Sequence, residues 1–199
     1  MPTDWPVLNE SESRKLIELA RDSVRHGLDH GRPLAAERTV AGTLAQPGAC
    51  FVSLHIGTEL RGCIGRTEAS TRLVDQLLDN AWAAAFRDPR FPPLRREELA
   101  QLSFELHVLT PLESLPFASL ADLYLRLRRG VDGLQLETES RRGVFLPVMW
   151  EQLPLPQEFV KQLLRKAEIR ETERFTASRF EAQVIRAGRL AGLAPDEPS

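Results

Sequence analysis

The chain has 199 residues, of which 42% are hydrophobic, 27% charged and 7% aromatic. A chain of this size and composition can bury a core without disulfides or metal. This excludes fibrous and wholly disordered classes but leaves open one large domain or two small lobes. Lysine and arginine number 26 against 28 aspartate and glutamate, so the formal net charge of −2 gives no overall field for nucleic acid or an anionic membrane.

The N-terminal sequence and the two cysteines indicate the compartment. The first six residues lack the positive and apolar regions of a signal peptide, and no stretch approaches the roughly 18 apolar residues of a membrane span. We therefore expect a cytoplasmic protein with no membrane partner. In a reducing compartment, a disulfide between Cys50 and Cys63 is not expected.

The first element expected is a long helix. Residues 9–12 have the spacing of a capping box, and apolar residues then recur at helical spacing, which predicts a helix over about 10–28. Residues 29–47 contain several glycines and prolines and show no sustained period. They predict a long connection with at most one short element.

Residues 50–64 predict a β-hairpin. Alternate residues from 50 to 56 are apolar, which is the period of a strand with one buried face. Residues 57–59 then form a short turn, and residues 60–64 return as the second strand.

A second helix and a stiff segment follow the hairpin. Ser70 or Thr71 is expected to cap a helix whose apolar positions continue to Phe86. The sequence Asp88-Pro89-Arg90-Phe91-Pro92-Pro93 is expected to be extended, since proline fixes its own φ and moves the preceding residue out of the α region.

The rest of the chain mixes helices and strands. The expected elements are a short helix over 94–99, a strand over 102–108, a helix from Ser119 to about Arg129, a hairpin of strands 134–138 and 144–149, a helix after Pro156 and a strand over 180–185. Because strands and helices do not alternate regularly, the expected class is α+β, with antiparallel or mixed sheets flanked by helices. We expect an arm over 1–9, the folded domain over 10–186 and a frayed tail over 187–199.

The segment Leu60-Arg61-Gly62-Cys63-Ile64-Gly65 places a thiol between two glycines, with Arg61 and Arg66 nearby. Glycine lets a ligand or another backbone approach closely, and guanidinium charge favours the nucleophilic thiolate. One interpretation is therefore a reactive cysteine at the end of a strand. The alternative is a small, half-buried and inert strand residue.

The hairpin register predicts the neighbours of the thiol. If the turn centres on Thr58, Ser53 faces Cys63. His55 then faces Arg61 and lies diagonal to the thiol on the same face, at about 7–8 Å between backbones. A one-residue slip would destroy this arrangement, and the alternative for His55 is a solvated side chain.

The string LRGCIG reproduces the signature of the AMMECR domain family, whose members include AmmeMemoRadiSam system protein A. Other segments resemble further blocks of this family in the same order, namely CFVSL (50–54), NAWAAAFRDPRFPPL (80–94), DGLQL (132–136), GVFLPVMWEQLP (143–154) and EFVKQLLRKA (158–167). The resemblance covers about residues 10 to 185. It implies an α+β fold of two dissimilar, intertwined lobes, with the signature lining a cleft between them.

The resemblance also implies partners. Bacterial and archaeal members are similar to the A component of a three-part system with a Memo-like protein and a radical S-adenosylmethionine enzyme, which suggests a role in a modification pathway. The first hypothesis is a component that binds a substrate or partner around LRGCIG. The alternatives are an enzyme with Cys63 as nucleophile, and a non-enzymatic scaffold for the two partners.

The candidate site residues follow from this hypothesis. Cys63 is the candidate catalytic group, and the candidate ligand-binding residues are Arg61, Gly62, Gly65, Asn80, Asp88, Arg90 and His55. Family members often carry lysine or another residue where His55 stands and a small residue where His107 stands. A role for either histidine would therefore be particular to this chain.

Several of these residues also have structural interpretations. Arg90 is suited to bidentate recognition of a carboxylate or phosphate, but Asp88 and Arg90 could instead pair and hold their loop. Asn80 is expected to cap or brace the same loop. Glu105 and His107 share one face of a strand, where a solvated sheet face is favoured over a polar cleft wall.

We expect no cofactor. The two cysteines and four histidines lack the ligand spacing of a metal site. The chain also has no glycine-rich phosphate loop, no Gly-x-Ser-x-Gly elbow and no Cys-x-x-x-Cys-x-x-Cys segment. Any radical chemistry would therefore belong to a partner.

Overall fold

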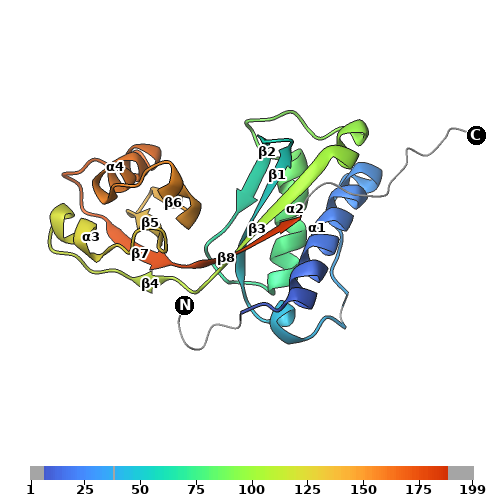
Figure 1. The fold of residues 1–199 in the computed structure, drawn as a ribbon, viewed down its shortest axis with the longest axis horizontal. Helices are drawn as coiled ribbons and strands as arrows, with labels where there is room; N and C mark the ends of the chain where they lie inside the picture. The colour runs from blue at the N-terminus through green and yellow to red at the C-terminus, as the bar shows by residue number, and fades with distance from the viewer. Residues whose placement is uncertain (1–6, 38, 188–199) are drawn as a thin grey trace, which may run out of the picture. The chain divides into compact units, whose positions relative to one another are not determined.

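The computed structural model describes residues 7–37 and 39–187, which form two compact units (Figure 1). The hairpin unit consists of residues 7–108 and 183–187, and the inserted unit consists of residues 109–182. Each unit has its own sheet and helices, which confirms the α+β class. None of the helices in these described residues is long and apolar enough to cross a membrane.

The hairpin unit is built on a four-stranded sheet of order β2-β1-β3-β8. The strands are β1 (Ala49–Ile56), β2 (Glu59–Gly65), β3 (Leu102–Leu109) and β8 (Ala182–Ala187). Helices α1 (Glu10–His30) and α2 (Leu73–Phe86) pack against each other, and α2 also packs on β1 and β2 (Figure 1). Two 3₁₀ helices, Gly42–Ala45 and Arg96–Gln101, lie in the connections.

Helix α1 begins with the expected capping box. The side chain of Asn9 accepts a hydrogen bond from the Glu12 backbone N–H at 2.9 Å, and the Glu12 carboxylate accepts one from the Asn9 N–H at 3.0 Å. Both bonds satisfy N–H groups that have no partner within the helix. The helix continues to His30, two residues beyond the predicted end, and Gly31 closes it with a φ of 68°.

Replacing Asn9 by alanine is expected to lower the free energy of unfolding by about 1 kcal/mol, because alanine lacks the side-chain oxygen that accepts the Glu12 N–H, although it keeps the backbone N–H that donates to Glu12. Urea denaturation followed by circular dichroism measures the change. Ser11→Ala, at an exposed position in the first turn, is the matched control and should leave stability almost unchanged. Equal midpoints for Asn9→Ala and the unmodified chain would contradict a stabilising cap.

The predicted cap of α2 is wrong. The N-cap is Arg72, without a capping side-chain bond, and neither Ser70 nor Thr71 occupies that position. The segment before the helix is held extended instead, since the Gly48 N–H donates to the Thr71 carbonyl at 3.1 Å and the Leu73 N–H donates to Gln46 at 2.8 Å. This pairing delays the first helical turn until Leu73.

The core of the hairpin unit lies between the sheet and its helices. The predicted inward residues Cys50, Val52 and Leu54 are fully buried, whereas Ile56, near the turn, is only half-buried. The apolar side chains of α1 and α2 close the same core, namely Leu16, Ile17, Ala20, Val24, Leu77, Leu78, Ala81 and Ala84. The thiol of Cys63 is on β2, at the edge of this sheet.

The inserted unit has a sheet of order β4-β7-β5-β6. Its elements are β4 (Glu113–Ser114), α3 (Leu120–Arg126), β5 (Gly133–Glu137), β6 (Arg142–Phe145), the 3₁₀ helix Pro147–Glu151, α4 (Pro156–Lys166) and β7 (Thr176–Phe180). The pairs β4–β7, β5–β6 and β5–β7 are antiparallel. The predicted apolar side of α4 is buried, including Phe159 and Leu163.

Three predicted boundaries in this part of the chain are wrong. Helix α3 begins after Ser119, as expected, but ends at Arg126. The predicted strand over 144–149 is a shorter β6 followed by the 3₁₀ helix, in which the Trp150 indole N–H donates to the Asp132 carbonyl at 2.7 Å. The single strand expected over 180–185 is two strands, because the chain passes from β7 of one sheet to β8 of the other.

The expected arm and tail lie largely outside the described residues. At the start of the described chain, Leu8 is buried, and its backbone N–H and carbonyl both bond the side chain of Gln183 on β8, at 2.9 and 2.8 Å. Residue 187 ends β8, and residues 188–199 are not described.

Candidate functional site

The thiol of Cys63 has the cross-strand neighbour that the sequence predicts. Ser53 pairs with Cys63 in the β1–β2 register, and its hydroxyl donates a hydrogen bond to the sulfur at 3.2 Å. Ser53 is buried and Cys63 is half-buried. A hydroxyl donor lowers the electron density on sulfur, but it is too weak a base to remove the thiol proton.

The predicted position of His55 is wrong. A register shift between Leu54 and His55 places His55 opposite Leu60, so Arg61 becomes the extra residue of the bulged strand. The expected diagonal between His55 and the thiol depends on an unbroken register, which this hairpin does not have. A ligand-binding role for His55 is not tested by this geometry and stays a prediction.

Asp88 connects the hairpin to the proline-rich loop. One of its carboxylate oxygens accepts the Cys63 backbone N–H at 2.8 Å and the Arg90 Nη2 at 2.7 Å. The other accepts the Arg90 Nε at 2.9 Å and the Arg90 backbone N–H at 3.1 Å. Arg90 Nη2 also donates to the Cys63 carbonyl at 3.2 Å, so both backbone groups of Cys63 are held by one ion pair.

In this ion pair the carboxylate is buried and the guanidinium is exposed. The side chain of Asp88 is 2% exposed, whereas that of Arg90 is 55% exposed. The hydrogen bond from Arg90, with further help from the two backbone N–H groups, lowers the pKa of Asp88 from 3.8 to about 2, although burial opposes the shift. The pairing of Asp88 with Arg90, one of the two interpretations from the sequence, is thus what the structure shows.

Arg61 is held by a second ion pair. Its Nε and Nη2 donate to the two carboxylate oxygens of Glu98 at 2.7 and 3.1 Å, and both side chains are mostly buried. The hydrogen bond from Arg61 lowers the pKa of Glu98. The ring of Phe91 lies 6.0 Å from the Arg61 guanidinium carbon and 5.5 Å from that of Arg90, which links the two ion pairs.

Glu98 was missed as a site residue. The sequence shows only an Arg- and Glu-rich segment over 94–99, in which one acidic residue cannot be singled out. Its partner Arg61 lies 37 positions earlier in the sequence, and no local sequence pattern reveals a contact between residues so far apart.

The two candidate glycines are positions of close packing. A Cβ at Gly62 would overlap the carbonyl oxygen of Ala84 in α2, and a Cβ at Gly65 would overlap the ring of Phe51. These contacts bring β2 close to α2 and to the neighbouring strand. Whether either glycine also borders a ligand stays a prediction.

Asn80 braces a strand and not the proline-rich loop. Its buried amide donates to the carbonyl of Cys50 at 3.0 Å, and the Gln76 side chain accepts the Cys50 N–H at 3.2 Å. Burial raises the pKa of the Cys50 thiol to about 12, which makes that cysteine unreactive. Both Cys50 and Cys63 are free thiols.

The solvated sheet face expected at His107 is wrong. The side chain of His107 is 1% exposed, and its Nε2 lies 2.7 Å from a carboxylate oxygen of Glu105. Arg186 also donates to Glu105, at 2.5 Å. The hydrogen bond from His107 is the main cause that lowers the pKa of Glu105 to about 2. Glu105 therefore partners the Nε2 of His107 within the protein, while the buried Nδ1 of His107 has no hydrogen-bond partner among the described residues.

Within residues 7–37 and 39–187, no group of three or more His, Cys, Asp or Glu side chains is placed to hold a metal ion. The site is instead a half-buried thiol, an exposed arginine and two ion pairs, arranged on β2 and on residues 88–98.

A family model described as AMMECR1 matches residues 17–185 of the chain. The chain belongs to the AMMECR1 family. It is similar to a protein of Methanothermobacter thermautotrophicus, with 39% identity over 143 residues that cover 72% of this chain and 74% of the relative. It is also similar to a protein of Thermofilum pendens, with 32% identity over 197 residues that cover 89% and 91% of the two chains.

A solved structure has the same fold. The crystal structure of an uncharacterised protein from Pyrococcus horikoshii matches with a TM-score of 0.82 and 27% identity, covering 89% of this chain and 92% of that chain. The homologues are AMMECR1-family proteins of uncharacterised function. Membership of the AMMECR1 family therefore establishes the fold, and the function must be argued from the site.

Proposed function

We propose that this AMMECR1-family chain is a binding component of a modification pathway, with a contact surface centred on Cys63 and Arg90. The observation that carries the proposal is the buried carboxylate of Asp88, which holds the Cys63 backbone and the Arg90 guanidinium together. A half-buried thiol and a 55% exposed arginine are thereby presented in a fixed arrangement. Such preorganisation lowers the entropy cost of binding.

Binding is favoured over catalysis because the charged groups near the thiol are already engaged. Asp88 is held by Arg90 and by the Cys63 N–H, and Arg61 is held by Glu98. The sulfur interacts with the Ser53 hydroxyl and with the Arg90 guanidinium, and neither group is the base that a cysteine nucleophile ordinarily has beside it. The guanidinium of Arg90 retains exposed surface, which suits an acidic group on a partner.

The resemblance to the AmmeMemoRadiSam system suggests which partners to test. We propose a Memo-like protein and a radical S-adenosylmethionine enzyme, both from the same genome, as binding partners. Any radical step would then occur on the partner, and this chain would supply recognition.

Attaching a bulky polyethylene-glycol maleimide to Cys63 is expected to weaken partner binding at least tenfold, since the adduct covers the proposed contact surface. Cys50 is fully buried, so one adduct per chain is expected. Biolayer interferometry against each purified partner measures the effect.

Two control variants define the result. Cys63→Ser treated with the same reagent should bind normally, and Lys161→Cys in the Cys63→Ser background places the adduct on exposed α4, where it should not interfere. If the Cys63 adduct binds as well as the unmodified chain, the contact surface lies elsewhere. If the unmodified chain binds neither partner, the pathway proposal fails.

Cysteine catalysis is the second candidate, because the Ser53 hydroxyl donates to the sulfur and would stabilise negative charge there. The same variants separate the two functions. If the chain is a binding component, the Cys63→Ser variant should still support formation of the modified product of the pathway. If Cys63 is a nucleophile, the same variant should bind its partners but support no product formation.

A further inference from the structure

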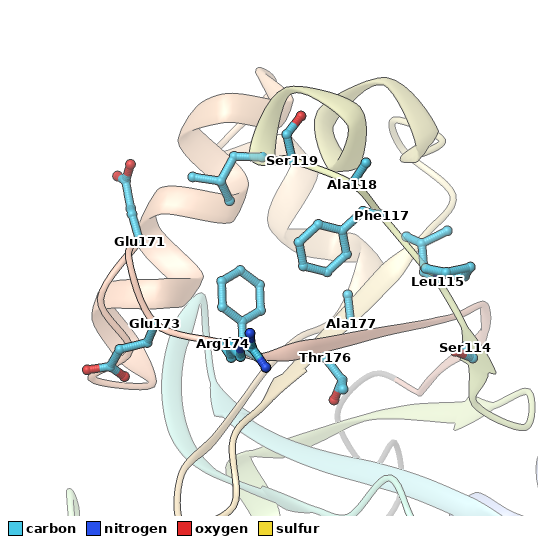
Figure 2. A pocket seen from close by; sticks show the side chains of 13 residues that line it. Ser114, Leu115, Phe117, Ala118, Ser119, Glu171, Glu173, Arg174, Thr176 and Ala177 are labelled. Atoms are coloured by element: carbon cyan, nitrogen blue, oxygen red, sulfur yellow. The ribbon is translucent and has the colours of Figure 1, made fainter.

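A groove of about 690 Å³ opens in the inserted unit, which contains neither the LRGCIG signature nor Cys63. It lies between residues 114–120 and residues 171–177 (Figure 2). Small-molecule and peptide-anchor sites commonly have volumes of about 300–1,000 Å³.

The groove opens where two strands separate. Strand β4 is paired with β7 only at Glu113 and Ser114, and the Leu115 N–H still donates to the Ala177 carbonyl at 2.8 Å. Pro116 has no N–H with which to continue the ladder. Beyond it the chain leaves β7 and turns into α3, so the side chains between them are left partly uncovered.

One wall of the groove is apolar. The rings of Phe117 and Phe175 are in contact, with centroids 5.3 Å apart, and both rings are half-buried against the core of the inserted unit. The buried side chains of Leu115 and Ala177 adjoin them. This wall can accept a further apolar side chain and remove it from water, together with the exposed part of the two rings.

An arginine that has no partner among the described residues borders the same groove. Glu173 is already paired with Arg141 at 2.5 Å and with Arg170 at 2.7 Å. Arg174, in contrast, is exposed, and its guanidinium forms no hydrogen bond or ion pair with any residue that the structure describes. In Figure 2 its nitrogen atoms lie beside Thr176, while the carboxylates of Glu171 and Glu173 point outward.

We propose that this groove binds the free carboxyl terminus of a partner chain that ends in an apolar residue. The terminal carboxylate would meet the Arg174 guanidinium, which offers paired N–H donors, and the terminal side chain would pack on Phe117 and Phe175. The net charge of the three arginines and two glutamates around this end of the groove is +1, which complements one carboxylate.

A chain end fits better than an internal acidic motif. In an extended peptide, successive side chains point to opposite sides, so an apolar residue and the acidic residue after it cannot enter one groove together. A C-terminal residue carries its carboxylate and its apolar side chain on the same Cα. Both groups can then reach the arginine and the aromatic wall from one position.

Two peptides test the proposal, N-acetyl-Gly-Gly-Phe and the same peptide with a C-terminal amide. They are titrated into the full, ¹⁵N-labelled chain and followed by NMR. The acid is expected to bind in the millimolar range and about fivefold more tightly than the amide, which corresponds to one exposed ion pair. The shifts should concentrate on residues 114–120 and 171–177. Shifts located elsewhere, or no saturation below about 10 mM, would overturn the proposal.

Two variants and one further peptide sharpen the test. Arg174→Gln should make acid and amide bind equally, Ala118→Trp should fill the groove and weaken both, and Arg165→Gln on exposed α4 should change neither. Retained preference for the acid in Arg174→Gln would exclude Arg174 as its partner. N-acetyl-Phe-Asp-amide, which has an internal carboxylate, should bind more weakly than the acid; equal binding would overturn the assignment of a chain end.

Discussion

Replacing Gly62 by alanine is expected to destabilise the hairpin unit by about 3 kcal/mol, because the added Cβ would overlap the carbonyl oxygen of Ala84 and lie 2.9 Å from its carbonyl carbon. The obstacle is helix backbone, which cannot move aside as the end of a flexible side chain can. Nor can β2 move away freely, since Gly62 pairs with Leu54 of β1. Relief therefore requires α2 and the hairpin to separate.

Urea denaturation of Gly62→Ala measures this cost, and a second substitution identifies its origin. Ala84→Gly removes the methyl group of Ala84 but leaves its carbonyl in place, so the double variant should be no more stable than Gly62→Ala. Leu60→Ala, an exposed position two residues away, should change stability by less than about 1 kcal/mol. Rescue by Ala84→Gly, or a cost as small as that of Leu60→Ala, would contradict a backbone clash.

The β1–β2 hairpin shows which structural features a sequence pattern can predict and which it cannot. The alternation of apolar and polar residues predicted β1, its turn and the pairing of Ser53 with Cys63, because a period of two indicates which face of a strand is buried. The bulge after Leu54 moved His55 out of its expected place. A bulge changes the pairing by one residue without altering composition, so the local sequence around residue 55 contains little sign of it.

The sequence indicates candidate site residues by their type but does not reveal their contacts. Arg61, Cys63, Asp88 and Arg90 were singled out by residue type, yet Asp88 lies 25 positions from the backbone N–H that it accepts. Asn80 illustrates the same limit, since its partner Cys50 is 30 positions away. Residue type indicates the capacity to bond, whereas the partner is decided by the packing of α2 on the sheet.

The inserted unit was harder to predict for a different reason. Its strand β4 contains two residues, and β7 passes into β8 after one intervening residue, Glu181. Neither is long enough to show a clear period, and the passage between sheets looks like one continuous strand. The groove beside Phe117 and Phe175 arises from these short elements, so it was missed as well.

Replacing Asp88 by asparagine is expected to lower the free energy of unfolding at pH 7 by about 2 kcal/mol, the value that corresponds to a pKa lowered from 3.8 to about 2. The Asp88 side chain is 2% exposed, so water screens its carboxylate little, although the Arg90 guanidinium of the pair is 55% exposed. Asparagine has nearly the same shape, but it loses the charge that pairs with Arg90 and turns an N–H₂ group toward donors. The Cys63 backbone N–H and the Arg90 guanidinium then compete for one amide oxygen.

The pH dependence separates this loss of charge from simple misfolding. The pKa of Asp88 is lower in the folded chain than in the unfolded chain, so its stabilisation is fully present above about pH 4 and is lost as the pH falls toward 2. The stability difference between the unmodified chain and Asp88→Asn should therefore shrink over that interval. Glu105, with a pKa also lowered to about 2, stays in both chains and cancels in the comparison.

Urea midpoints measured at several pH values between 7 and about 2.5 give this difference directly. Asp79→Asn, at an exposed position of α2, is the matched control and should show no comparable change. A difference that stays constant down to low pH would mean that folding does not lower the pKa of Asp88, so that the ion pair with Arg90 adds no net stability. The ion pair would then hold neither Cys63 nor Arg90, and the proposed contact surface would lose its physical basis.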